Sequence, residues 1–207
     1  MKCSPYWAGW SKMTSIVDYR AGNLTSVRLA FEALGEQAVV TSDPAVVASS
    51  DRVVFPGVGA AASAMENLTA LGLADVVREA AASKPFLGIC LGMQILFERS
   101  EEDGGVGTLG IIPGIVRRFP DAPGFKIPQI GWNDVRTVDP SAPENGEFYY
   151  FVHSYCADVC PYTFGITGYA GVEFTSIVRK GRLLATQFHP EKSGKAGLAL
   201  IRRWLES

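Results

Sequence analysis

The residues with the clearest capacity for chemistry are one cysteine and the glycines beside it. Cys90 stands between Gly88 and Gly92 in the run PFLGICLGMQ, where residues 85–89 have the apolar pattern of a short buried strand and an amphipathic pattern begins at Leu91. A sharp strand-to-helix turn presents a nucleophile, and glycines flank it because a Cβ atom would clash in so tight a bend. We therefore predict that Cys90 is a nucleophile at a helix N-terminus, where backbone N–H groups and the helix dipole favour the thiolate.

Two residues that follow Cys90 are placed to assist it. The N–H group of Leu91 is expected to be free to donate to an oxyanion, and Gln94 lies one helical turn beyond Cys90, so its side chain can face the same pocket. The alternative for Cys90 is a small buried hydrophobic residue, the common state of a free cysteine. The spacing G-x-C-x-G-x-Q in the context of a predicted strand and helix favours the functional interpretation.

A second glycine-containing turn has the sequence PGVG at residues 56–59 and follows another predicted strand. The N–H groups of Gly57 and Val58 are expected to be free, which makes this turn a candidate for the second half of an oxyanion hole, opposite Leu91. The alternative is an ordinary connection between a strand and a helix. A dinucleotide site is not indicated, because the third glycine of that fingerprint is absent.

A thiolate nucleophile needs a base, and the chain has only two histidines, His153 and His189. His189 lies in TQFHPE, where a predicted buried strand ends and Pro190 keeps the preceding residue extended. In an extended segment Glu191 projects to the same side as His189, so its carboxylate can hold one imidazole nitrogen. These residues predict a triad of nucleophile, base and orienting carboxylate: Cys90, His189 and Glu191.

The second histidine belongs to a pattern that resembles loose metal-ligand spacing, formed by His153, Cys156 and Cys160. If residues 148–155 are a strand, His153 and Cys156 point to opposite faces, and no fourth ligand is evident. We interpret the three as core and loop residues and predict neither a metal nor a cofactor.

Bulk properties limit the class of protein. With 207 residues, 47% of them hydrophobic and 19% charged, the chain is expected to form one globular domain. A net charge of −2 does not indicate the basic surface that binds nucleic acid. No apolar run approaches the length needed to span a bilayer. The four irregularly spaced cysteines favour free thiols in a reducing compartment, so we expect a cytosolic protein. Residues 1–12 lack periodicity and are expected to be an extension outside a folded domain at 13–207.

Strand and helix patterns alternate in the first half of the chain. Strands are expected at 15–18, 37–41 and 52–55, and helical spacing over 24–34 is bounded by the N-cap candidate Asn23 and the terminator Gly35. The segment 98–110 is expected to be a surface loop. Short strands then follow at 115–119, 133–138, 148–152, 163–167, 173–179 and 183–188, with a hairpin turn at 180–181 and a final helix over 194–205. The prediction is an α/β fold: a doubly wound, mainly parallel sheet with helices on both faces and an added antiparallel region in the C-terminal half.

With these residues in place, the chain resembles the triad-type glutamine amidotransferases from about residue 13 to its C-terminus, through PFLGICLGMQ, PGVG and FHPE. Within that superfamily it is most similar to the glutaminase subunits of imidazole glycerol phosphate synthase, through DYRAGNLTSV, KIPQIGWND and FYYFVHSY followed by FHPEKS. The resemblance implies that Cys90 attacks a glutamine carboxamide, that His189 protonates the departing ammonia and that Glu191 orients His189.

Further roles are implied by the resemblance alone. Gln94 and the backbone around Gly57, Ser154 and Tyr155 are expected to hold the glutamine. Ammonia is expected to pass to a separate (β/α)8-barrel cyclase subunit, which makes imidazole glycerol phosphate and aminoimidazole carboxamide ribotide in histidine biosynthesis. The residues expected to line that interface are Asn23, Trp132, Tyr150 and Lys192. The pattern departs from the family in residues 1–12 and at Gln129, where relatives often carry histidine.

Three alternatives stay open from the sequence. The chain could be a glutaminase serving another synthase, such as anthranilate synthase, or a cysteine hydrolase of γ-glutamyl peptides that needs no partner. A third alternative, a non-catalytic regulatory relative, is disfavoured because Cys90, His189 and Glu191 are all present.

Overall fold

The computed structural model describes residues 12–20 and 22–207, and most of the predicted 1–12 extension lies outside these residues. A run of five parallel strands forms the centre of the main sheet, in the order β2-β1-β3-β4-β14. Their bounds are β1 Thr14–Val17, β2 Ala38–Thr41, β3 Arg52–Gly57, β4 Phe86–Cys90 and β14 Leu183–Thr186. The carboxyl ends of β3 and β4 therefore lie side by side, and Gly57 is in register with Cys90. Ligand sites of parallel sheets form at this edge.

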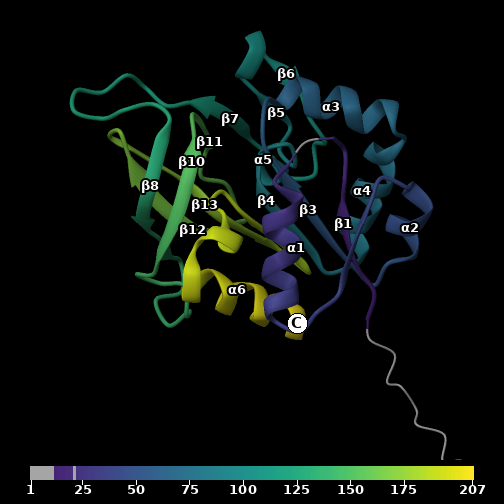
Figure 1. The fold of residues 1–207 in the computed structure, drawn as a ribbon. Coiled ribbons are helices and arrows are strands. Elements are labelled where there is room, and N and C mark those ends of the chain that lie inside the picture. The colour runs from purple at the N-terminus through teal and green to yellow at the C-terminus, as the bar shows by residue number, and fades with distance from the viewer. Residues whose placement is uncertain (1–11, 21) are drawn as a thin grey trace, which may run out of the picture.

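Helices cover both faces of this sheet, as predicted (Figure 1). Val53 and Phe55 of β3 pack into the core beneath α2 (Pro44–Ser49), α3 (Ala61–Ala70) and α4 (Leu73–Ser83). Val54, between them, packs into the opposite core with α1 (Leu24–Ala33) and α6 (Gly194–Glu206). Successive strand residues thus serve two cores, which explains why these strands are apolar on both faces.

The ends of α1 follow the local rules of helix capping. The side chain of Asn23 accepts a hydrogen bond from the N–H of Ser26, which confirms its prediction as the N-cap. After the last helical residue, Gly35 adopts a φ of 80°, a left-handed conformation that terminates the helix.

The C-terminal half adds antiparallel strands to the main sheet, beginning with β13 (Val172–Lys180), which pairs with β14. The path continues through β11 (Tyr155–Ala157), β7 (Ile115–Arg118), β5 (Arg99–Ser100) and β6 (Val106–Gly107), and of these pairs only β7 with β5 is parallel. β12 (Thr163–Tyr169) and β9 (Arg136–Thr137) branch from β13. β8 (Gln129–Asp134) and β10 (Phe148–His153) instead form a separate two-stranded sheet, visible at the left of Figure 1.

Several local predictions were wrong in extent. The expected strand at 133–138 divides into the end of β8 and the whole of β9. The helix after Cys90 is a single turn, α5 (Leu91–Gln94), and the expected loop at 98–110 contains β5, β6 and the 3-10 helix η1 (Glu102–Gly104). The last predicted strand does form the expected hairpin with β13, and β14 also pairs in parallel with β4, so it lies inside the sheet and not at its edge.

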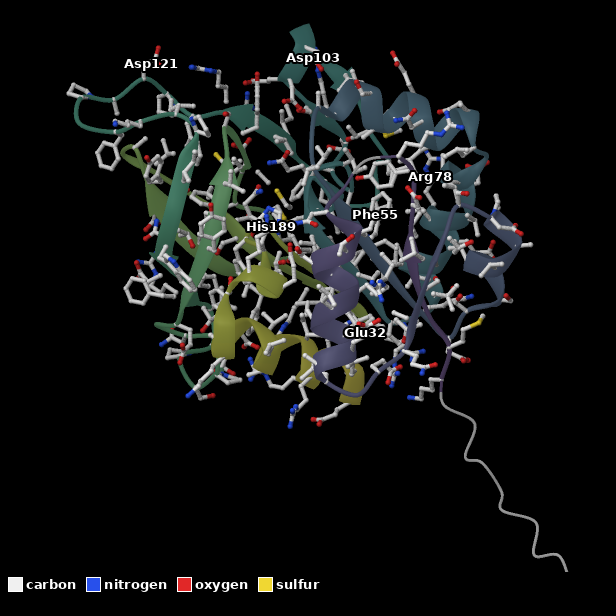
Figure 2. The ribbon with its side chains drawn as sticks, viewed as in Figure 1. Glu32, Phe55, Arg78, Asp103, Asp121 and His189 are labelled. Carbon is white, nitrogen blue, oxygen red and sulfur yellow. The ribbon has the colours of Figure 1, made fainter. Side chains whose placement is uncertain are left out.

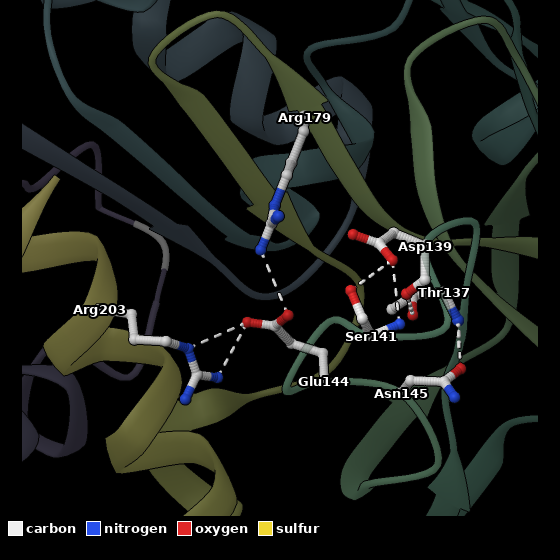
Figure 3. Close-up of polar contacts among 7 residues, drawn as sticks. All are labelled: Thr137, Asp139, Ser141, Glu144, Asn145, Arg179 and Arg203. Atoms are coloured by element: carbon white, nitrogen blue, oxygen red, sulfur yellow. Dashed lines mark hydrogen bonds and ion pairs between the residues drawn. The ribbon is translucent and has the colours of Figure 1, made fainter.

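A buried carboxylate fastens α6 to the loop that follows β9. Glu144 is 1% exposed, and its Oε1 accepts from Nε and Nη2 of Arg203 at 3.2 and 2.8 Å, while Arg179 Nη2 lies 3.3 Å from Oε2 (Figure 3). In the same loop, Oδ1 of Asp139 accepts from the backbone and hydroxyl of Ser141. The loop, β13 and α6 are thereby joined by polar contacts away from the parallel edge where β4 ends.

Candidate active site

Cys90 occupies the turn between β4 and α5 in a strained backbone conformation. Its φ of 56° and ψ of −113° are rare for a residue with a Cβ atom and are typical of functional sites. A Cβ atom on Gly92 would lie 1.9 Å from the carbonyl oxygen of Phe55, so only glycine fits where α5 crosses β3. Because α5 has only one turn, its dipole is much smaller than that of a longer helix, so side chains must contribute more to stabilising the thiolate.

His189 and Glu191 meet beside this turn. His189 follows β14, the strand next to β4, and Figure 2 shows it in the interior of the molecule. Its Nδ1 lies 2.8 Å from Oε1 of Glu191, and both side chains are almost fully buried. The predicted reason for this contact was wrong: Glu191 lies in the 3-10 helix η2 (Pro190–Lys192), so a turn and not an extended segment brings the two together.

The charge on His189 depends on these neighbours. Burial lowers its pKa, but the Cys90 sulfur and the Glu191 carboxylate favour the imidazolium more strongly and raise the pKa to about 10. The contact with the Cys90 sulfur is the largest contribution that raises this pKa, and the hydrogen bond to Glu191 comes next. A protonated imidazole beside a sulfur nucleophile is the arrangement that activates cysteine and can later protonate a leaving group.

A cavity of about 300 Å³ opens above Cys90 and His189. Five of the six residues predicted to bind substrate line it: Val58, Leu91, Gln94, Ser154 and Tyr155. The sixth, Gly57, is the last residue of β3 and is buried behind the cavity, where a Cβ atom would lie 2.0 Å from Oη of Tyr19. Glu191 also lies behind the cavity, on the far side of His189. The cavity further includes Gly59, Glu102, Pro128, Val152 and His153, none of which was predicted to belong to the site.

Glu102 brings a carboxylate to this cavity. It belongs to η1, and its Oε2 accepts from the N–H of Ala61 at 2.8 Å, at the start of α3. Burial raises its pKa, while the Ala61 hydrogen bond opposes that change. The sequence offered no signal for this position, because the acidic run around it has the composition of a solvated loop.

His153 is buried among core phenylalanines, as expected, and it also lines the cavity, which was not predicted. Its Nδ1 lies 2.7 Å from the carbonyl oxygen of Tyr155, so Nδ1 carries the hydrogen. Burial, together with the charge of His189, lowers the pKa of His153 to about 4, although the Tyr155 contact opposes this. The side chain is therefore neutral at pH 7 and faces the cavity without competing for the proton of His189.

Comparison with known proteins identifies the group to which this geometry belongs. A sequence profile described as "Glutamine amidotransferase class-I" matches residues 15–206. The subunit HisH of imidazole glycerol phosphate synthase from Aromatoleum aromaticum is 49% identical over 92% of this chain and 96% of its own length. The corresponding HisH protein of Methanothermobacter thermautotrophicus is 45% identical over 94% of this chain and 98% of its own length. The chain belongs to the HisH group of class-I glutamine amidotransferases.

Solved structures show the same fold at low sequence identity. A crystal structure of a glutamine amidotransferase covers 93% of this chain with a TM-score of 0.72 and 20% identity, and 97% of that chain is matched. PurLQS from Thermotoga maritima covers 94% of this chain, with 98% of that chain matched, a TM-score of 0.68 and 18% identity. The predicted α/β architecture of this amidotransferase is therefore confirmed.

The four residues expected at a partner interface lie around one part of the amidotransferase surface. Trp132 and Tyr150 are paired across β8 and β10 with their ring centroids 6.3 Å apart, and Trp132 is 56% exposed. Lys192 is exposed at the end of η2, which is tied to β10 by the hydrogen bond from the N–H of His189 to the carbonyl of Tyr150. Asn23 begins α1, which contacts η2. This surface lies beside the triad.

A second cavity, of about 410 Å³, lies near the amino end of β14 and is lined by Glu144, Arg179, Arg203 and Trp204 among others. Its position at the opposite end of the parallel strands separates it from Cys90. Among residues 12–20 and 22–207, no group of three or more His, Cys, Asp or Glu residues is arranged to hold a metal ion, and no helix is long and apolar enough to cross a membrane.

Proposed function

We propose that this chain hydrolyses the side-chain amide of glutamine through a γ-glutamyl thioester on Cys90. The thiolate attacks the amide carbon, and the resulting oxyanion accepts hydrogen bonds from the backbone N–H groups of Leu91 and Val58. Nε2–H of His189 protonates the departing nitrogen, which leaves as ammonia. Nε2 then takes a proton from water, whose oxygen attacks the thioester and releases glutamate and the Cys90 thiolate. The buried His189–Glu191 contact is the observation that supports this mechanism best, because it holds Nδ1 of His189 and leaves Nε2 to serve Cys90.

Glutamine is proposed to lie with its side-chain amide toward Cys90 and its amino-acid end toward Glu102. The Glu102 carboxylate and Oε1 of Gln94 are both suited to accept from the α-ammonium group, and the backbone of Ser154 and Tyr155 is placed to bind the α-carboxylate. The cavity, about 300 Å³, is of the right size for one amino acid.

Ammonia is proposed to pass to a (β/α)8-barrel cyclase subunit that binds over Trp132, Tyr150, Lys192 and Asn23. Support comes from the HisH relatives, which are named as subunits of imidazole glycerol phosphate synthase. The cyclase would use the ammonia to make imidazole glycerol phosphate and aminoimidazole carboxamide ribotide, and we place the complex in the cytosol.

Two measurements test the proposal. Co-purification of the chain with a cyclase subunit, and an increase in ammonia release from glutamine when the cyclase and its ribotide substrate are added, are expected. The turn at Val58 is 41% exposed and lies at the mouth of the cavity, so partner binding can order its N–H as an oxyanion donor, worth about a hundredfold to a thousandfold in rate. Equal activity on a γ-glutamyl dipeptide without any partner would favour an independent hydrolase instead.

A further inference from the structure

A second buried glutamine contacts the nucleophile. Nε2 of Gln187 lies 3.8 Å from Sγ of Cys90, within the range for a hydrogen bond to sulfur, and Gln187 is fully buried. Gln187 stands between β14 and His189, and its own backbone N–H is fixed by a 2.9 Å bond to the carbonyl of Ser176. The side chain is therefore held next to Cys90 from the strand that also carries the base.

The direction of this contact is determined by a chain of hydrogen bonds that begins at one backbone carbonyl. The Tyr155 oxygen can only accept, so the Gln94 atom 2.7 Å from it is the amide nitrogen Nε2. The second hydrogen of that nitrogen points to Gln187, whose nearer atom, 2.9 Å away, must be the oxygen Oε1. The remaining end of the Gln187 amide, which faces Cys90, is therefore a donor.

His153 is a second donor to the carbonyl at which this chain of hydrogen bonds begins. Its Nδ1–H donates to the same Tyr155 oxygen at 2.7 Å, so both lone pairs of that oxygen are occupied. A flipped Gln94 amide would place its oxygen against the Tyr155 oxygen and Gln187 Oε1, a costly arrangement in a buried site.

We propose that Gln187 is a positioning residue that donates an N–H hydrogen bond to the Cys90 thiolate, with its direction fixed through Gln94 by the Tyr155 carbonyl. The proposal extends the proposed glutaminase mechanism, since it concerns the same nucleophile. The bond stabilises the thiolate both before it attacks and when it leaves the thioester, and it holds Sγ in one orientation. With only one helical turn after Cys90, a side-chain donor supplies what a longer helix dipole would give elsewhere.

The test is the pH dependence of alkylation of Cys90 by iodoacetamide in the full chain, read by peptide mapping. Gln187→Leu removes the donor at similar volume, so alkylation on the acid side of the rate profile should fall about 10- to 100-fold, the range for a hydrogen bond to a charged group. The acid side of the rate profile should move to higher pH, while the alkaline plateau should stay. Thr167→Val, which removes a buried hydrogen-bonding side chain of β12 outside the cavity, is the control and should keep the parent profile.

The outcomes separate this inference from the proposed function and from a packing role. A Gln187→Leu profile that overlays that of the parent chain overturns the inference. If that variant does not fold, Gln187→Met decides: its flexible side chain fills a similar volume without a strong donor, so slower alkylation supports the inference and an unchanged profile overturns it. If neither variant folds, Gln94→Leu decides in the same way by releasing the Gln187 amide. Normal alkylation without glutamine hydrolysis in the cyclase complex would instead contradict the proposed function.

Discussion

Nδ1 of His189 and Oε1 of Glu191 lie 2.8 Å apart although only one residue, Pro190, separates them in the chain. The turn of η2 lets the carboxylate reach back beneath the ring and leaves Nε2 as the nitrogen that can serve Cys90. The pair is assembled locally, so its geometry depends little on distant parts of the fold. Bringing this pair to Cys90 depends on the sheet, because β14 and β4 are neighbours.

Cys90 should be the cysteine labelled by an electrophile that mimics glutamine, in preference to Cys156 and Cys160. Burial raises the pKa of Cys156 to about 12, so that thiol stays protonated and weakly reactive. Peptide mapping after labelling checks this. Cys90→Ala should lower glutamine hydrolysis on the order of a millionfold, and residual turnover near the parent rate would exclude Cys90 as the nucleophile.

Lys192→Ala should uncouple the two proposed subunits without unfolding this one. Lys192 is exposed in η2, next to the surface of Trp132 and Tyr150, where an acidic residue of the cyclase would desolvate it. Synthesis from glutamine should weaken while synthesis from added ammonium salt survives. Lys195→Ala, which also removes an exposed lysine, serves as the control. Unchanged coupled activity and unchanged affinity for the cyclase would reduce Lys192 to a surface charge.

The stability of the chain should fall as the pH decreases from about 6.5 to about 4. In this window the unfolded chain binds a proton at His153, with an ordinary pKa of about 6.5, whereas the folded chain does not, because its pKa is about 4. The associated loss is on the order of 3 kcal/mol. The raised pKa of His189 affects stability in a different pH range. Its stabilising contribution is lost only as the pH rises from about 6.5 to about 10.

Urea unfolding of the parent chain and of His153→Gln across this acid range measures the effect. The glutamine side chain can still donate to the Tyr155 carbonyl but does not titrate, so the variant should show a flatter dependence of unfolding free energy on pH. The same slope in both proteins would show that His153 does not titrate between the two states.

Glu144→Ala should destabilise the fold by about 1–3 kcal/mol. The value lies below that for a fully buried pair because Arg179 and Arg203 are 43% and 37% exposed in their side chains and can rehydrate. Thermal unfolding measures the change. Arg117→Ala, which breaks exposed ion pairs with Glu101 and Asp158, should cost much less, because solvent screens exposed pairs. Equal losses in the two variants would argue against a special role for the buried carboxylate.

The fold was predictable to the extent that local pattern determines it. Apolar strands of the parallel core and the cap at Asn23 follow from short-range rules, and the structure confirms them. The predicted hairpin turn at 180–181 is present but shifted by one residue, because Lys180 pairs with Leu183 and the turn is at 181–182. The position of β14 between β4 and β13 was not predictable, because strand order depends on contacts between residues about 100 positions apart. The separate β8–β10 sheet was missed for the same reason. The alternation of apolar and polar residues in these two strands is that of any half-buried strand and does not indicate which strand is the partner.

The site residues also divide into those that the local sequence indicates and those that only the tertiary structure reveals. Cys90, His189 and Glu191 stand in compact motifs whose spacing indicates their chemistry, and the structure brings the three together. Glu102 and His153 reach the cavity through tertiary packing, and the residue types around them are those of a loop and a core strand. Gln187 lies within TQFHPE but has no local signal for its direction, which depends on Gln94 and the Tyr155 carbonyl.

The central place of β14 has a consequence for the order in which the site can form during folding. Cys90 and its turn lie where β4 ends beside β3, whereas His189 and Glu191 reach the thiol only because β14 pairs with both β4 and β13. A chain in which β14 has not joined the sheet therefore has no base beside its thiol. Glutamine hydrolysis by this mechanism thus reports the completed sheet, and not the Cys90 turn alone.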